Sequence, residues 1–180
     1  MSKVITFSRT FPAYHPKAGQ PTYFVEKFYN SIYRNGSESM EEIGRINQHL
    51  PPAVFMPFLD SMVACEERKH HTIRAGHNWK VGDKFSPRVW SGRPYNSKQV
   101  VIAPDVEIKK VWDIEIKEFS DGRWIDFGNY KISEHMAFPM TVLPLLARND
   151  GLELQDLLDW FKFPKPFTGQ ILCWNENINY

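Results

Sequence analysis

The chain has 180 residues, with 22 lysines and arginines against 21 aspartates and glutamates, which gives a formal net charge of +1. A chain of this length is expected to form a single domain, residues 1–180, that buries most of its apolar surface in one core. A charge so close to neutral excludes binding to long nucleic acid through overall charge, so any anion site must be local.

The sequence contains neither a membrane span nor a signal segment that we can identify. No run approaches the roughly 18 apolar residues that a spanning helix needs. Met1 is followed by the polar Ser2 and Lys3, and the two cysteines, Cys65 and Cys173, lie far apart. The polar start of the chain and its two widely separated cysteines predict a soluble, cytoplasmic protein in a reducing environment, without contact to a membrane.

The first part of the chain is predicted to be one strand followed by helices. Phe24, Phe28 and Ile32 recur at helical spacing, and prolines and glycines interrupt the segment before them. We expect a strand at 3–7, a loop at 8–21, and helices at 22–34, 37–50 and 53–68. Residues 8–68 are therefore predicted to be a largely helical elaboration inserted after the first strand.

From His71 onward, short β-rich segments alternate with glycine, proline, asparagine and aspartate. We expect strands at 71–74, 83–90, 97–104, 106–119 and 123–128. Sequential strands at this spacing predict a meander that closes into a small β-barrel.

The last part of the chain is predicted to be two helices and a strand. The segment 133–150 reads as a helix kinked at its prolines, and 150–161 carries leucines at amphipathic helical spacing. A final strand is predicted at 168–174. The expected fold is thus α+β, a small barrel with helices inserted after the first strand and before the last strand.

A motif follows the predicted insert. Its residues are Glu67, Lys69, Thr72 and Arg74, and then Lys80, Gly82 and Asp83. They resemble the ASCH domain of the PUA-like superfamily, small β-barrels that bind RNA and modified bases. That family carries Gly-x-Lys-x-x-Glu-x-Arg followed by a Lys-x-Gly-Asp turn, so Glu67 stands in place of its glycine and Thr72 in place of its glutamate.

With threonine at position 72, the motif resembles that of the N4-acetylcytidine amidohydrolase branch of the family, which carries Lys-x-x-Thr-x-Arg. The resemblance covers residues 3–7 and about 66–174. It implies a PUA-like barrel, catalytic roles for Lys69 and Thr72, and an acid at Asp150, where that branch has glutamate. The implied reaction is hydrolysis of a carbon–nitrogen amide bond.

The chemistry of amide hydrolysis can be matched to these residues. It needs a nucleophile, a base and donors for the developing oxyanion. Thr72 offers the hydroxyl, Lys69 the base and Arg74 the positive field, with Asp150 as an orienting acid. Because strand residues alternate between faces, Lys69 can join Thr72 only if it precedes the strand or lies at a bulge.

Other residues are candidates for binding a ligand. His70, Thr72 and Arg74, two apart, are expected to share one face of a strand. Aromatic and basic side chains follow, as in surfaces that stack bases and contact phosphates. The predicted ligand-binding residues are Arg74, His70, Trp79, Arg88, Trp90, Arg93, Tyr95 and Lys98.

A metal site is not predicted. His70, His71 and His77 cluster near Cys65, but adjacent strand residues point to opposite faces, and no established metal-ligand spacing occurs. We expect neither a metal nor a cofactor.

Three functions are left open by the sequence. The first is binding of RNA or of a modified nucleobase or nucleoside. The second is an amidohydrolase that removes an acyl group from N4-acylcytidine. The third is binding of a protein partner through the 8–68 insert and its aromatic helix at 22–34.

Overall fold

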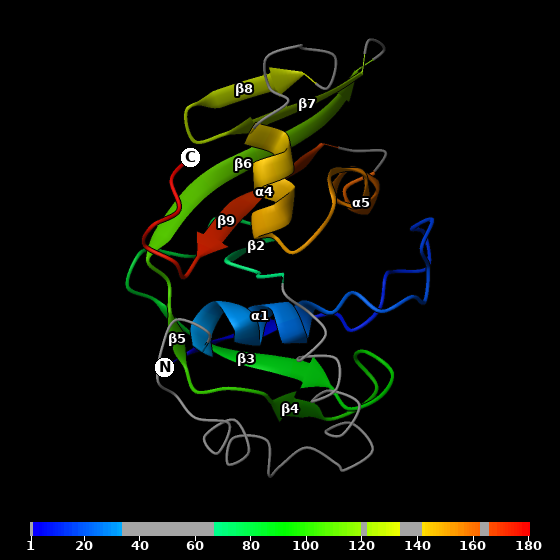
Figure 1. Cartoon of the computed structure of the whole chain (residues 1–180), viewed down its shortest axis with the longest axis vertical. Helices are drawn as coiled ribbons and strands as arrows, with labels where there is room; N and C mark the ends of the chain where they lie inside the picture. Colours follow the sequence, from blue (N-terminus) through cyan, green and yellow to red (C-terminus); the bar gives the residue numbers. More distant parts are fainter. Residues whose placement is uncertain (1, 34–66, 120–121, 134–141, 163–165) are drawn as a thin grey trace. The chain divides into compact units, whose positions relative to one another are not determined.

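The computed structural model describes residues 2–33, 67–119, 122–133, 142–162 and 166–180. Over these residues the chain is α+β, with three helices and two mostly antiparallel sheets (Figure 1). It divides into two compact units. Unit 1 comprises Met1–Ala13, Lys17–Lys69 and Asp83–Glu107, and unit 2 comprises Tyr14–Pro16, His70–Gly82 and Ile108–Tyr180. The single domain expected over the whole chain stays a prediction.

Unit 1 contains a sheet built around β3 (Lys84–Trp90). On one side β3 pairs in parallel with β1 (Lys3–Thr6). On the other side it pairs antiparallel with two short strands, β4 (Gln99–Val101) and β5 (Val106–Glu107). The first predicted strand is therefore confirmed, and the strand predicted at 97–104 is shorter than expected.

Pro87 explains why two short strands, and not one long strand, pair with this side of β3. A proline has no N–H to donate to a ladder. The pairing with β5 ends at Phe85 and the pairing with β4 begins at Arg88, so Pro87 lies at the break. Its carbonyl still accepts a hydrogen bond from the N–H of Ile102 at 3.0 Å.

Helix α1 (Phe24–Tyr33) supplies much of the core of unit 1. Phe28 is fully buried, and its ring lies 4.9 Å from the ring of Phe7 and 6.3 Å from that of Phe85. The hydroxyl of Thr22 accepts a hydrogen bond from the N–H of Phe24 at 3.3 Å, which gives one of the first N–H groups of the helix a partner. The helix predicted at 22–34 is confirmed, and its aromatic side chains serve as core.

Unit 2 contains a five-stranded antiparallel sheet with the strand order β2-β9-β6-β7-β8. Its strands are β2 (His71–Ala75), β6 (Lys110–Phe119), β7 (Gly122–Phe127), β8 (Tyr130–Ser133) and β9 (Phe167–Cys173). The last strand of the chain thus lies between β2 and β6. Helices α4 (Val142–Asn149) and α5 (Leu154–Trp160) precede it, as the sequence predicts.

The two faces of this sheet differ in polarity because side chains alternate along each strand. The register places Ile73 beside Ile171 and Ile171 beside Trp112 on the apolar face. Helices α4 and α5 cover this face (Figure 1), and the ring of Phe161 lies 4.8 Å from that of Phe167. The other face carries polar side chains from β6, β7, β8 and β9.

Three features of the strands differ from the predictions. The strand predicted at 106–119 is divided into β5 and β6. Strand β8 was not predicted; it follows a two-residue turn in which Gly128 has φ +54°, a conformation that suits glycine. The meander predicted to form a closed barrel instead pairs as two sheets, and over the described residues neither sheet closes on itself.

Some predicted elements lie outside the described residues. These are the helices predicted at 37–50 and 53–68 and the first half of the helix predicted at 133–150. Among the helices that the structure describes, none combines the length and the apolar character needed to cross a membrane.

Substituting Gly169 by alanine should destabilise the protein strongly. A Cβ at Gly169 would overlap the carbonyl oxygen of Arg74 on the paired strand β2. We expect Gly169→Ala to lower the free energy of unfolding by about 2–3 kcal/mol in urea denaturation, because two backbones must separate. Gly92→Ala is the control, since its Cβ would lie at an ordinary 3.5 Å from Ser97. Equal stability of the two variants would contradict the close approach of β2 and β9.

Candidate functional site

Lys69, the predicted base, is buried in unit 1, with 1% of its surface exposed. Its N–H donates to the carbonyl of Lys27 at 2.9 Å. Its ammonium nitrogen lies 4.2 Å from the centroid of the Phe24 ring, close enough for attraction by the ring face. Because β2 begins at His71, Lys69 precedes the strand, as the motif requires.

Thr72 and Arg74 lie on β2 in unit 2, two residues apart and therefore on one face of the sheet. Thr72 is 5% exposed and is paired with Leu172 of β9. Arg74 is half-buried and is paired with Gln170. The backbone of Thr72 is thus held in place by pairing with β9.

His70, predicted to share that face, precedes the strand. Its N–H donates to the carbonyl of Asn149 at 2.7 Å, and its Nδ1 lies 3.0 Å from Nδ2 of Asn175. Trp79, also in unit 2, donates its backbone N–H to Oε1 of Gln170 at 3.0 Å, and its carbonyl accepts a hydrogen bond from Nε2 of Gln170 at 3.3 Å. These contacts hold the segments on either side of β2.

Asp150, the predicted acid, is 5% exposed and follows α4 in unit 2. Its Oδ1 lies 3.4 Å from Nδ1 of His71, a fully buried histidine on β2. Nε2 of His71 lies 2.8 Å from the hydroxyl of Tyr180, which also accepts a hydrogen bond from Asn149 at 2.8 Å. The structure therefore joins Asp150 to two residues that the sequence did not single out as ligands or catalysts.

The hydroxyl of Tyr180 accepts from Asn149 and keeps one O–H of its own, which can donate to Nε2 of His71. In the His71 tautomer that this bond favours, the ring N–H is on Nδ1, on the side of Asp150. Burial raises the pKa of Tyr180 above its ordinary value, opposed by the Asn149 hydrogen bond and reinforced by Cys173 and Asp150. The phenol therefore stays protonated at neutral pH.

Cys173 lies opposite His71 in the sheet. Burial raises the pKa of its thiol to about 11, although a backbone hydrogen bond of Asn175 and the charge of Lys110 act in the other direction. A thiol protonated at neutral pH is a poor nucleophile. Cys173 is thus a structural residue of the sheet.

The remaining predicted ligand residues lie in unit 1, on the hairpin formed by β3 and β4. Tyr95 is 88% exposed, and its ring centroid lies 5.4 Å from that of Trp90. Arg88 is directed along the hairpin by hydrogen bonds to Ser86 at 3.2 Å and Gln99 at 3.3 Å. The exposed turn predicted around Tyr95 is confirmed.

The hairpin loop has a defined conformation. The N–H of Ser91 donates to the carbonyl of Lys98 at 2.9 Å, and the hydroxyl of Ser97 bridges the N–H of Gly92 and the carbonyl of Arg93. Between Phe85 and Pro104 the sequence contains three cations, Arg88, Arg93 and Lys98, and no carboxylate. The hairpin therefore presents an aromatic side chain in a locally positive surface.

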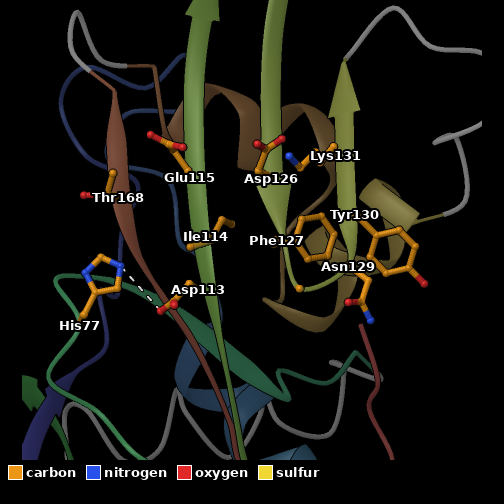
Figure 2. Close-up of a pocket in the computed structure, with 11 residues that line it drawn as sticks. His77, Asp113, Ile114, Glu115, Asp126, Phe127, Asn129, Tyr130, Lys131 and Thr168 are labelled. Carbon is orange, nitrogen blue, oxygen red and sulfur yellow. Dashed lines mark ion pairs between the residues drawn. The ribbon is translucent and has the colours of Figure 1, made fainter.

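Unit 2 also contains a polar hollow of about 570 Å³ (Figure 2). The register places Thr168, Glu115, Asp126 and Lys131 in one row across β9, β6, β7 and β8. At one end His77 Nε2 lies 3.7 Å from Asp113 Oδ1. Glu115 is paired with Lys117 at 2.8 Å. None of the residues predicted to bind ligand lines this hollow.

In the part of the chain that the structure describes, no group of three or more histidines, cysteines, aspartates or glutamates is placed to hold a metal ion. The predicted site residues fall into two sets. Lys69, Arg88, Trp90, Arg93, Tyr95 and Lys98 belong to unit 1, and His70, Thr72, Arg74, Trp79 and Asp150 belong to unit 2.

No family model matches the chain, and no curated protein or solved structure matches it significantly.

Removing the Tyr180 hydroxyl should destabilise unit 2. Tyr180→Phe takes away the partner of the buried Asn149 amide and of Nε2 of His71. We expect a loss of about 1–3 kcal/mol in the free energy of unfolding. Tyr130→Phe is a matched control, since Tyr130 also packs against Phe127 but is exposed. If Tyr180→Phe lowers the free energy of unfolding no more than Tyr130→Phe does, the hydrogen bonds of the Tyr180 hydroxyl do not stabilise unit 2.

The stability difference should also depend on pH. The pKa of Tyr180 is raised in the folded protein, so its contribution is complete below the unfolded value of about 10 and is lost as pH rises beyond it. The gap between the wild-type protein and Tyr180→Phe should therefore narrow in strongly alkaline solution.

Proposed function

We propose that the chain binds RNA or a modified nucleobase or nucleoside through the β3–β4 hairpin of unit 1. One observation carries the proposal. Tyr95 is 88% exposed, rests against Trp90, and lies among three cations in a stretch without carboxylates. This combination offers a planar surface for a base and positive charge for phosphates.

Energetics favour a small, unpaired ligand over a duplex. Stacking of a base on an aromatic side chain contributes about 1–3 kcal/mol and requires an unpaired base. Arg93 and Lys98 are exposed and can reach phosphate oxygens, whereas the net charge of +1 gives no broad attraction for long nucleic acid. The hairpin therefore fits a nucleoside, a nucleotide or a short single strand.

The ASCH resemblance of the 67–83 motif supports the same proposal. A relation to PUA-like barrels implies a base-binding protein. We include in the proposal that the α+β fold is related to that of such proteins.

Binding can be tested by fluorescence anisotropy with a labelled single-stranded RNA of about eight nucleotides. We expect Tyr95→Asn to raise Kd about tenfold, because the ring is lost while asparagine accepts the positive φ of this residue. Tyr95→Phe should bind within about twofold of the wild type, because the ring that stacks remains.

A salt series separates the contribution of the cations. With three cations on phosphates, the slope of log K against log salt should be about −2, and Arg93→Gln or Lys98→Gln should each make it less steep by about 0.7. Exposed Tyr130→Asn in unit 2 is a control that should bind like the wild type. If Tyr95→Asn and both cation variants bind the RNA like the wild type, the proposal that the β3–β4 hairpin binds it is wrong.

A second candidate, hydrolysis of N4-acylcytidine, is favoured by the burial of the three motif residues. Lys69, Thr72 and Asp150 are 1%, 5% and 5% exposed. Lysine and aspartate are rarely buried to this degree, and buried ionisable groups concentrate at catalytic sites. An exposed surface role for these residues is therefore excluded, which leaves structure or catalysis.

Acetate release from N4-acetylcytidine tests this candidate. If Thr72 is the nucleophile, Thr72→Val should abolish turnover while Tm changes by only a few degrees, because the side chain keeps its shape and loses only the hydroxyl. Lys69→Met should also abolish turnover, since the base is lost and the apolar stem is kept. If Thr72→Val still releases acetate, Thr72 is not the nucleophile.

The third function, partner binding through the aromatic helix at 22–34, has the least support. Phe24, Phe28 and Tyr29 of α1 are all buried, so they are not available to a partner. The rest of the 8–68 insert lies largely outside the described residues.

A further inference from the structure

One face of β3 carries an oriented arginine beside the aromatic pair of the hairpin. Ser86, Arg88 and Trp90 alternate along the strand and therefore share this face. The register sets Gln99 of β4 opposite Trp90, so Gln99 lies on the same face. The ring of Trp90 lies 5.4 Å from that of the exposed Tyr95. Arg88 is thus two residues along the strand from the surface proposed to stack a base.

Two hydrogen bonds hold the guanidinium of Arg88 in one orientation. Its Nε–H donates to the hydroxyl of Ser86 at 3.2 Å, and an N–H of Nη1 donates to Oε1 of Gln99 at 3.3 Å. Ser86 is 5% exposed and is therefore a fixed support. The residue opposite Arg88 on β4 is Val101, which cannot ionise, and residues 85–104 contain no carboxylate. Neutral groups orient this guanidinium, and no acid of the hairpin neutralises its charge.

The groups that these bonds leave available are donors. Arginine has five N–H groups and no acceptor, so within the described residues three N–H groups of Arg88 remain for a ligand. Gln99 gives its oxygen to Arg88, which leaves its amide NH₂ group. A positively charged set of donors selects a ligand group that is negative and consists of acceptors. A phosphate is such a group, and its hydrogen bonds to a guanidinium are charge-assisted.

We propose that Arg88 and Gln99 form a phosphate subsite beside Trp90 and Tyr95, so that the hairpin prefers a nucleotide with a terminal phosphate to an unphosphorylated nucleoside. The inference rests on the proposed base binding at the hairpin and names the class of ligand for it. Arginine can hold a phosphate through two parallel N–H bonds, which fixes direction as well as charge. Two residues along a strand span about 6.6 Å, an interval that the ribose between a base and its phosphate can bridge.

Titration calorimetry with adenosine 5′-monophosphate (AMP) and with adenosine, at one salt concentration, tests the subsite. We expect the wild type to bind AMP about tenfold more tightly than adenosine, because the phosphate adds charge-assisted hydrogen bonds. Arg88→Lys keeps the charge and loses the planar fork, so Kd for AMP should rise about fivefold. Gln99→Glu sets a carboxylate of the same size beside Arg88, and Kd for AMP should rise about tenfold. In both variants Kd for adenosine should stay within about twofold of the wild type, which also shows that the hairpin is folded.

Arg148→Lys is the matched control, since Arg148 is an exposed arginine of α4 in unit 2. It should bind both ligands like the wild type. Tyr95→Asn should weaken both ligands by a similar factor, because it removes the base stack and leaves the phosphate contacts.

The failure of the subsite and the failure of the proposed function are distinguishable. If the wild type binds AMP and adenosine equally, or if Arg88→Lys and Gln99→Glu keep the wild-type preference for AMP, the phosphate subsite is overturned. The same holds if Arg88→Lys weakens both ligands equally, since Arg88 then contacts the base. In each case weak binding by Tyr95→Asn leaves the proposed function standing. If the wild type binds neither AMP, nor adenosine, nor the eight-nucleotide RNA, both fall.

Discussion

The register between β2 and β9 is the constraint on which the placement of the unit 2 motif residues depends. A shift by one residue would move Thr72 to the face now occupied by His71 and reverse every side chain of β2. Gly169 fixes the register by admitting the Arg74 carbonyl, and Gln170 reinforces it through two hydrogen bonds to the backbone of Trp79. The same pairing sets His71 opposite Cys173.

Buried polar contacts hold the residues at the start of β2, Lys69 just before the strand and His71 as its first residue. In unit 2, His71 is held between Asp150 and Tyr180, so polar groups that would be costly to bury have partners. In unit 1, Lys69 is held by the Lys27 carbonyl and the Phe24 ring. Such networks favour one well-defined arrangement of the side chains that they contain.

Local signals predicted much of the fold, and non-local contacts account for what they missed. The spacing of Phe24 and Phe28 predicted α1, and the alternation rule required Lys69 to precede β2. The place of β9 between β2 and β6 has no periodic signal, because pairing across the chain is not encoded within a short window. Strand β8 was missed because it is short and depends on the turn at Gly128.

The site was predicted unevenly for related reasons. Arg93 and Tyr95 were predicted on an exposed turn from glycine and proline alone, and the structure confirms their exposure. Tyr180 was missed because it follows a polar segment without a pattern, although it completes the His71 network. The positive φ of Tyr95, +65°, could not be predicted, since positive φ is expected of glycine and asparagine.

The two leading functions make opposite demands on their residues. A stacking surface must be open to solvent before the ligand arrives, and Tyr95 at 88% exposure meets that demand. Amide hydrolysis would gain from excluded water, because charges in a dry site interact more strongly, and Thr72 and Asp150 of unit 2, each 5% exposed, are buried as such a site would require. Since the residues differ, binding at the hairpin and chemistry at the motif do not exclude each other. Loss of binding by Tyr95 variants, with turnover of the free nucleoside unchanged, would show two separable activities in one chain.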